Sequence, residues 1–176
     1  TIYNGMINPL IPYTIKGVIW YQGENNAFRH EEYGDLLSLL ISDWRSKWGS
    51  VFPFYYVQIA PYFNYYDSNA SLREVQRKAL KNQKTGMVVT LDIGEKYDIH
   101  PSNKHDVGFR LARYALKNDY KTDLIESGPL FKSLSINEGV IKVFFDYVAD
   151  GLVFDQGDYS EFEIAGLDKK YFRADV

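Results

Sequence analysis

Short apolar runs suited to buried strands alternate along this chain with segments of helical periodicity. The strand-like runs are rich in β-branched and aromatic residues and cover residues 15–21, 54–59 and 86–92. The helix-like segments place apolar residues on one face and cover residues 33–48, 71–81 and 104–118. Strand–helix alternation of this kind predicts an α/β fold, in which helices pack on a parallel sheet.

Two local signals predict where these helices end or begin. Gly49 follows the first helical segment at the position expected for a C-terminal cap. Ser71 stands three residues before Glu74, which is the spacing of a capping box. The second helix is therefore expected to begin at Ser71, after a loop over residues 62–70.

The pattern changes after about Ser127. Short strand-like runs separated by glycine and aspartate replace the helical segments, at residues 131–134, 140–145, 152–154 and 162–164. We therefore expect two parts, an α/β part over residues 1–126 and a β-rich extension, or the start of a β-domain, over residues 127–176.

Composition argues against several classes of protein. The 176 residues carry a net charge of −3 with no basic stripe, which argues against a nucleic-acid surface. Without cysteine, the chain has no disulfides, no cysteine-ligated zinc and no thiol nucleophile. No apolar run approaches the roughly 20 residues of a membrane span. Residues 1–5 resemble neither a signal peptide nor a translation start, so we expect a fragment or a processed chain.

In an open α/β sheet, ligands bind at the carboxyl ends of the strands. Three loops are expected there, at residues 22–26, 61–69 and 92–105. In the first loop, Gly23 permits close backbone approach, and the amide of Gln22 is able to donate to a developing oxyanion. The alternative is an ordinary loop in which Glu24 or Asn25 caps the following helix.

The other two loops carry a histidine and several aromatic rings. Asp98 and His100 have the carboxylate–imidazole arrangement of a general base, and the alternative is a surface histidine in a polar turn. His100 and His105, taken with Asp92 or Asp98, match none of the usual zinc spacings, so neither a metal nor another cofactor is predicted. Four aromatic residues of the second loop offer ring faces to a sugar-sized ligand: Tyr62, Phe63, Tyr65 and Tyr66. The alternative is that these rings fold back onto the core.

Several longer stretches carry more information than their spacing alone. They are residues 3–7 (YNGMI), 15–24 (IKGVIWYQGE), 43–45 (DWR) with Trp48-Gly49, 54–60, 72–74 (LRE) with Gln76, 98–104 (DIHPSNK), 107–108 (VG), 110–112 (RLA) and 162–166 (FEIAG). In this order, and over nearly the whole chain, they closely resemble the sialate O-acetylesterase family of SGNH-type hydrolases.

The resemblance implies a serine esterase that removes O-acetyl groups from sialic acids, on a three-layer α/β/α, flavodoxin-like fold with a parallel sheet. Residues 1–126 would then be the C-terminal portion of an SGNH domain that is incomplete at its N-terminus. It also implies that His100 is the general base and Asp98 its carboxylate partner. Asp92 is the alternative acid, because the family more often separates acid and base by two residues.

The same resemblance assigns the remaining site residues. Gln22 and Gly23 lie where these enzymes place oxyanion donors, and Glu24 is expected to be a structural partner in that loop. The residues expected to contact the sugar are Glu24, Asn25, Tyr62 and Tyr65.

The nucleophilic serine of this family lies in a Gly-Gln-Ser-Asn-Met-like block near the start of the catalytic domain. No such block contains Ser38, Ser42, Ser46, Ser50, Ser68, Ser71 or Ser102. We therefore expect the nucleophile upstream, so the upstream part of the same protein is a partner of this chain. Two alternatives remain, an esterase acting on xylan or another acetylated glycan and a non-catalytic fragment that binds glycan or completes a scaffold. The usual settings of the family predict a periplasmic or extracellular location.

Overall fold

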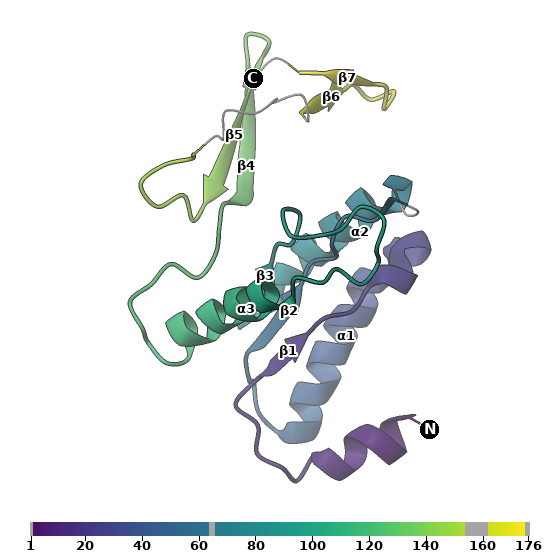
Figure 1. The fold of residues 1–176 in the computed structure, drawn as a ribbon, viewed down its shortest axis with the longest axis vertical. Coiled ribbons are helices and arrows are strands. Elements are labelled where there is room, and N and C mark those ends of the chain that lie inside the picture. The colour runs from purple at the N-terminus through teal and green to yellow at the C-terminus, as the bar shows by residue number, and fades with distance from the viewer. Residues whose placement is uncertain (1, 64–65, 154–161, 175–176) are drawn as a thin grey trace. The chain divides into compact units, whose positions relative to one another are not determined.

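The computed structural model describes residues 2–63, 66–153 and 162–174, with the backbone alone described at residues 66 and 67. The chain divides into two compact units, Thr1–Leu130 and Phe131–Val176 (Figure 1).

The first unit is built on a three-stranded sheet in the order β1-β2-β3, and both strand pairs are parallel. The strands are β1 (Val18–Trp20), β2 (Phe54–Val57) and β3 (Thr85–Val88). The α-helices are α1 (His30–Trp48), α2 (Tyr66–Lys78) and α3 (Lys104–Asn118). Short 3₁₀ or π turns cover Tyr3–Ile7, Asn8–Leu10, Glu24–Arg29 and Ala79–Lys81. The predicted α/β class with a parallel sheet is confirmed.

The central strand β2 is buried on both faces, which explains why its sequence is a continuous apolar run. Successive side chains of a strand point to opposite faces. Phe54 and Tyr56 accordingly pack in one core with α1 and α2, whereas Tyr55 and Val57 pack in a second core with α3. The first unit therefore has three layers, with helices on both faces of the sheet (Figure 1).

The first and third helices agree with their predicted spans. α1 ends at Trp48, and Gly49 caps it in the left-handed conformation with φ of 62°. The N–H of Gly49 donates to the carbonyls of Arg45 and Ser46, which satisfies two groups that the helix end leaves unpaired. α3 begins after Asn103, whose side chain accepts from the N–H of Asp106.

The predicted start of the second helix is wrong. α2 begins at Tyr66, so Ser71 lies inside the helix and the predicted loop over residues 62–70 is shorter. The carboxylate of Glu74 forms a two-pronged ion pair with Arg77, at 2.7 and 2.8 Å. This pair lowers the pKa of Glu74 and uses the group that a capping box would need.

The two edges of the sheet differ. Along β3, the hydroxyl of Tyr114 donates to the carbonyl of Met87 at 2.9 Å, and Arg110 donates to the carbonyl of Val89 at 2.7 Å. Side chains of α3 therefore occupy one outward carbonyl of this edge strand and one carbonyl just beyond its end. Along β1, the described strands provide a partner on one side alone, and Ile19 is 68% exposed.

The second unit consists of two strand pairs. β4 (Leu130–Asn137) pairs with β5 (Val140–Asp146), and β6 (Glu163–Ala165) pairs antiparallel with β7 (Tyr171–Arg173). Glu138 and Gly139 join β4 to β5 with φ of 49° and 78°, the backbone of a tight hairpin turn. The predicted run at 152–154 forms no strand at residues 152 and 153, and residue 154 lies outside the described residues. The sequence patterns did not predict β7.

Candidate active site

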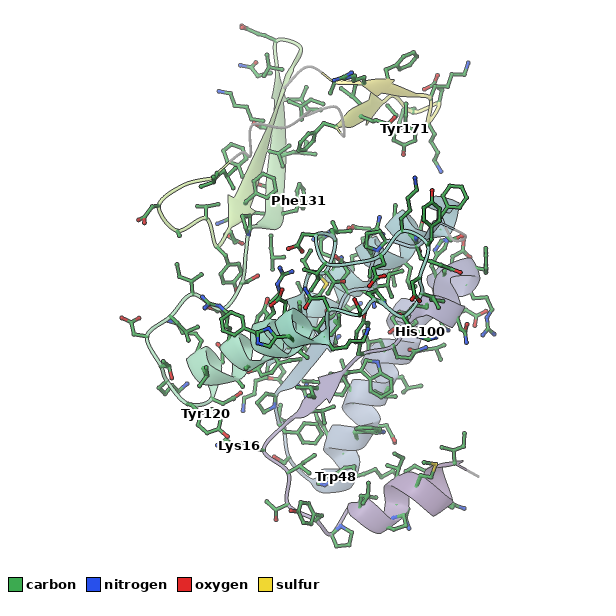
Figure 2. The ribbon with its side chains drawn as sticks, viewed as in Figure 1. Lys16, Trp48, His100, Tyr120, Phe131 and Tyr171 are labelled. Carbon is green, nitrogen blue, oxygen red and sulfur yellow. The ribbon has the colours of Figure 1, made fainter. Side chains whose placement is uncertain are left out.

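The loops that follow β1 and β3 lie at the carboxyl end of the parallel sheet. Figure 2 shows His100 at the end of the first unit toward which the strands run, on the loop between β3 and α3. His100 is exposed, so its imidazole is accessible from solvent. Gln22 and Gly23 follow β1 by two and three residues and therefore lie at the same end of the sheet.

Hydrogen bonds fix the loop after β1. The side-chain amide of Gln22 donates to Oδ1 of Asn26 at 2.8 Å, and its backbone carbonyl accepts from the hydroxyl of Tyr33 at 2.7 Å. The N–H of Asn26 donates to the carbonyl of Gly23 at 2.7 Å. One amide hydrogen of Gln22 is used inside the loop, and the second has no partner among the described residues.

Glycine is required at position 23. Its φ of 154° is a conformation that other residues rarely adopt. A Cβ atom there would lie 3.1 Å from Cγ2 of Ile59 and 3.2 Å from Nε2 of Gln76. The absence of a side chain therefore lets the loop backbone pack directly against the end of β2 and against α2.

Gln76 joins α2 to the chain that leaves β2. Its side chain is buried, with Oε1 accepting from the N–H of Ile59 at 2.9 Å and Nε2 donating to the carbonyl of Val57 at 3.3 Å. The carbonyl of Gln76 accepts from the hydroxyl of Tyr56 at 2.8 Å. One side chain thus satisfies two buried backbone groups directly beneath Gly23.

Glu24 and Asn25 open the 3₁₀ turn that leads into α1. The N-cap residue of α1 is Arg29, without a side-chain capping bond, so neither Glu24 nor Asn25 caps this helix. Asn25 is exposed and Glu24 is half-buried. Burial raises the pKa of Tyr21, and the nearby charge of Glu24 raises it further.

The loop that carries His100 is closed on itself. Oε1 of Glu95 accepts from both the N–H and the hydroxyl of Ser102 at 2.7 Å, which lowers the pKa of Glu95. Because its hydroxyl is committed to Glu95, Ser102 is a structural residue of the loop. Oδ1 of Asp98 accepts from the backbone N–H of His100 at 2.7 Å. Asp98 therefore binds the main chain of the expected base through Oδ1.

Asp92, the alternative acid, is engaged elsewhere. Its two carboxylate oxygens accept from Arg110 at 2.7 and 2.5 Å, and this hydrogen-bonded pair lowers the pKa of Asp92. The arrangement holds Asp92 against α3 and occupies both of its carboxylate oxygens.

Lys104 connects the two loops that carry the expected base and the expected oxyanion donor. Its ammonium donates to the carbonyl of Pro101 at 2.5 Å and lies 5.2 Å from the ring centroid of Tyr21. Pro101 directly follows His100, and Tyr21 directly precedes Gln22. The contact brings the two blocks side by side although they are far apart in the sequence.

The loop after β2 completes this end of the sheet. Tyr62 is half-buried, and its carbonyl accepts from the side chain of Asn69 at 2.8 Å. Tyr65 lies outside the described residues. The N–H of Phe63 donates to the carbonyl of Lys96 at 2.8 Å and joins this loop to the histidine loop. The sequence patterns do not identify Lys96 or Tyr97 as site residues, because no local signal indicates that they contact residue 63.

A cavity of about 650 Å³ lies against the outer edge of β3, and Asp92 is among its lining residues. Its described walls include Met87, Val89, Arg110, Tyr114 and Glu126, and they do not include His100 or Gln22. Over the described ranges, no group of three or more His, Asp or Glu side chains is arranged to hold a metal ion. No helix in those ranges is long and apolar enough to cross a membrane.

The arrangement places an imidazole and a primary amide at one edge of the sheet, in loops fixed by hydrogen bonds. An imidazole is able to accept a proton, and a primary amide is able to stabilise a negative oxygen. These are two of the elements that acyl transfer requires.

Comparison with known proteins identifies the family of this chain. A family model described as "Carbohydrate esterase, sialic acid-specific acetylesterase" matches residues 2–117. The chain is 32% identical over 158 residues to the sialate O-acetylesterase of Rattus norvegicus and 31% identical over 170 residues to that of Mus musculus. These alignments cover 77% and 82% of the chain but only 29% and 31% of the two relatives.

A solved structure supports the same assignment. A carbohydrate acetylesterase from Xanthomonas citri matches with a TM-score of 0.87 and 39% identity, over 98% of this chain and 42% of that one. The resemblance drawn from the sequence and the fold class that it implied are thereby confirmed. The chain belongs to the carbohydrate esterase family of sialic acid-specific acetylesterases.

Proposed function

We propose that the complete protein is a serine esterase that removes O-acetyl groups from sialic acids, with His100 as its general base. The observation that carries the proposal is the contact made by Lys104, which holds the His100 loop beside the Gln22 loop. The relatives that are named sialate O-acetylesterases support the substrate class.

In the proposed reaction, a serine hydroxyl attacks the acetyl carbonyl while His100 accepts the serine proton. The Gln22 amide, with the backbone near Gly23, donates to the oxyanion that forms on the carbonyl oxygen. Collapse of this intermediate breaks the bond to the sugar oxygen, which receives the proton from His100. Water, deprotonated by His100, then attacks the acetyl-serine, and acetate leaves as the serine regains its proton.

Asp98 is the proposed support of the base. Oδ1 of Asp98 holds the N–H of His100, and within the described residues Oδ2 carries no hydrogen bond. Oδ2 is therefore the atom assigned to the imidazole, where a carboxylate would fix the tautomer and stabilise the protonated ring.

The nucleophile is proposed to lie in a part of the full-length protein that precedes residue 1. Among the described strands β1 has a partner on one side alone, which supports pairing of a further strand there. In parallel α/β sheets, such a strand ends at the same edge as its neighbour, so a serine that follows it would face His100.

The isolated chain and the full-length protein are expected to differ in acetate release. Full-length protein should release acetate from O-acetylated sialic acid, whereas residues 1–176 alone should not, because they lack the proposed nucleophile. Enzymatic acetate assays at equal concentrations measure both. Acetate release by the isolated chain would contradict the proposed position of the nucleophile. A full-length protein that releases no acetate would contradict the esterase function.

A second candidate substrate class is favoured by the structure from Xanthomonas citri, which is described as a carbohydrate acetylesterase. Acetylated xylan, assayed beside O-acetylated sialic acid, separates the two candidates. A preference for acetylated xylan would keep the chemistry and change the substrate.

Replacing Gln22 with alanine in the full-length protein is expected to lower kcat by about 10²–10³-fold. This is the usual effect of removing one oxyanion donor, because the lost hydrogen bond forms mainly in the transition state. Steady-state kinetics on O-acetylated sialic acid measure the change. A Gln83→Ala variant is the matched control and should leave kcat unchanged, since Gln83 is an exposed glutamine in the turn before β3, at the other end of the sheet. Full turnover by Gln22→Ala would show that Gln22 is not the donor.

A further inference from the structure

The loops after β2 and β3 are joined beside the proposed site. The N–H of Phe63 donates to the carbonyl of Lys96 at 2.8 Å. Gly94 packs against Pro61 so closely that a Cβ atom at position 94 would lie 2.4 Å from Cδ of Pro61. The two loops are therefore joined near Phe63 and Lys96 by a main-chain hydrogen bond and by the close approach of Gly94 to Pro61.

Three exposed side chains meet where these loops join, and we name them the Phe63–Lys96–Tyr97 cluster. The rings of Phe63 and Tyr97 lie 5.9 Å apart with an interplanar angle of 53°. Phe63 is 53% exposed and Tyr97 is 76% exposed. The ammonium of Lys96 lies 5.6 Å from the Phe63 centroid and 5.3 Å from the Tyr97 centroid, within the range of cation–π attraction.

The charge of Lys96 is not neutralised by the described part of the chain, where no carboxylate forms an ion pair with it. Two other cations at this end of the sheet are committed, since Arg110 pairs with Asp92 and Lys104 donates to the carbonyl of Pro101. The whole chain carries a net charge of −3, so an unneutralised ammonium here does not follow from a generally basic surface.

The cluster lies close to the proposed base. The N–H of Asp98 donates to the carbonyl of Glu95 at 3.2 Å, so Lys96 and Tyr97 form the tip of a closed turn. Three Cα–Cα steps separate Tyr97 from His100, which limits the distance between their Cα atoms to about 11 Å. A single nine-carbon sugar is long enough to contact both the turn and the base.

We infer that the Phe63–Lys96–Tyr97 cluster binds the carboxylate-bearing end of the sugar and selects anionic over neutral acetylated sugars. The two rings offer apolar surface to the sugar, and the Lys96 ammonium pairs with the sugar carboxylate. This inference rests on the proposed esterase function and adds the residues that determine its charge preference.

Lys96→Gln in the full-length protein tests the inference. Three substrates separate charge recognition from chemistry: O-acetylated sialic acid, its neutral methyl ester, and 4-nitrophenyl acetate. We expect kcat/KM for the acid to fall about tenfold, mainly through KM, which is the usual effect of losing one charged hydrogen bond. Hydrolysis of the two neutral substrates should be unchanged, and the loss on the acid should shrink at high salt.

Lys16→Gln is the matched control. Lys16 also lies over a tyrosine ring, 5.8 Å from the centroid of Tyr120, and Figure 2 shows this pair at the opposite end of the first unit from His100. The Lys16→Gln variant should have the wild-type kcat/KM for all three substrates. An equal fall of kcat/KM for the acid in both variants would overturn the inference. So would a Lys96→Gln variant in which the ratio of kcat/KM for the acid to kcat/KM for the methyl ester is unchanged.

A binding measurement separates failure of the inference from failure of the proposed function. If the full-length protein hydrolyses none of the three substrates, the proposed function has failed, and calorimetric titration with N-acetylneuraminic acid still tests the cluster. The Kd should rise about tenfold in Lys96→Gln and stay constant in Lys16→Gln. Equal affinity in wild type and Lys96→Gln, or no binding by the wild type, would overturn the inference.

Discussion

Replacement of His100 by alanine in the full-length protein is expected to lower kcat for acetate release by about 10³–10⁴-fold. Without the imidazole, the attacking hydroxyl must lose its proton to water, and the departing sugar oxygen has no positioned acid. KM should change little, because the lost interaction acts on the transition state. Steady-state kinetics on O-acetylated sialic acid measure both constants.

His105→Ala is the control for this prediction. His105 is also an exposed histidine, five residues after His100 in the first turn of α3, where its Nδ1 contacts Oδ1 of Asp106 at 3.0 Å. Because it takes no part in the proposed reaction, its replacement should leave kcat within about twofold. Comparable losses in the two variants would indicate damage to the loop, and wild-type turnover by His100→Ala would exclude the assigned base.

Gln76→Leu is expected to lower the free energy of unfolding by about 2–6 kcal/mol. Leucine is similar in size, but it leaves the buried N–H of Ile59 and the carbonyl of Val57 without their partners. Each unsatisfied buried group costs about 1–3 kcal/mol. Urea unfolding followed by tryptophan fluorescence measures the change, because all three tryptophans lie in β1 or α1 of the first unit.

Gln83→Leu is the matched control, since Gln83 is exposed and no described hydrogen bond involves its side chain. Its effect on the free energy of unfolding should stay within about 0.5 kcal/mol. An equally small effect of Gln76→Leu would show that water or a rearranged backbone replaces both bonds. The result also bears on catalysis, because Gly23 packs on the Gln76 amide and positions the Gln22 loop.

The helices were predictable where one face of a segment is apolar and its end carries a clear signal. α3 runs from Lys104 to Asn118 as predicted, because its buried residues Val107, Leu111 and Tyr114 recur at helical spacing. The start of α2 was not predictable from Ser71 and Glu74, because the same glutamate has a better partner one turn later in Arg77. A local capping pattern cannot reveal which of two partners a carboxylate takes.

The candidate site was predictable only at the level of loops. Gln22 and His100 were identified because each follows a strand-like run, and parallel strands place such residues on one edge. The bond from the His100 main chain to Asp98, and the commitment of Asp92 to Arg110, depend on side-chain directions that spacing does not encode. The preference for Asp98 over Asp92 stays a proposal, and it rests on these coordinates and not on spacing.

The sequence by itself determined the α/β class, the family, and the two blocks that carry the proposed chemistry, because periodicity and motif order are properties of the chain. Tertiary structure alone decided which loops touch. Lys104 reaches Tyr21 across more than 80 positions of sequence, and Phe63 meets Lys96 and Tyr97 from a different loop. Such contacts arise when strands pair in register and helices pack on both faces of the sheet, and no pattern local to one segment specifies them.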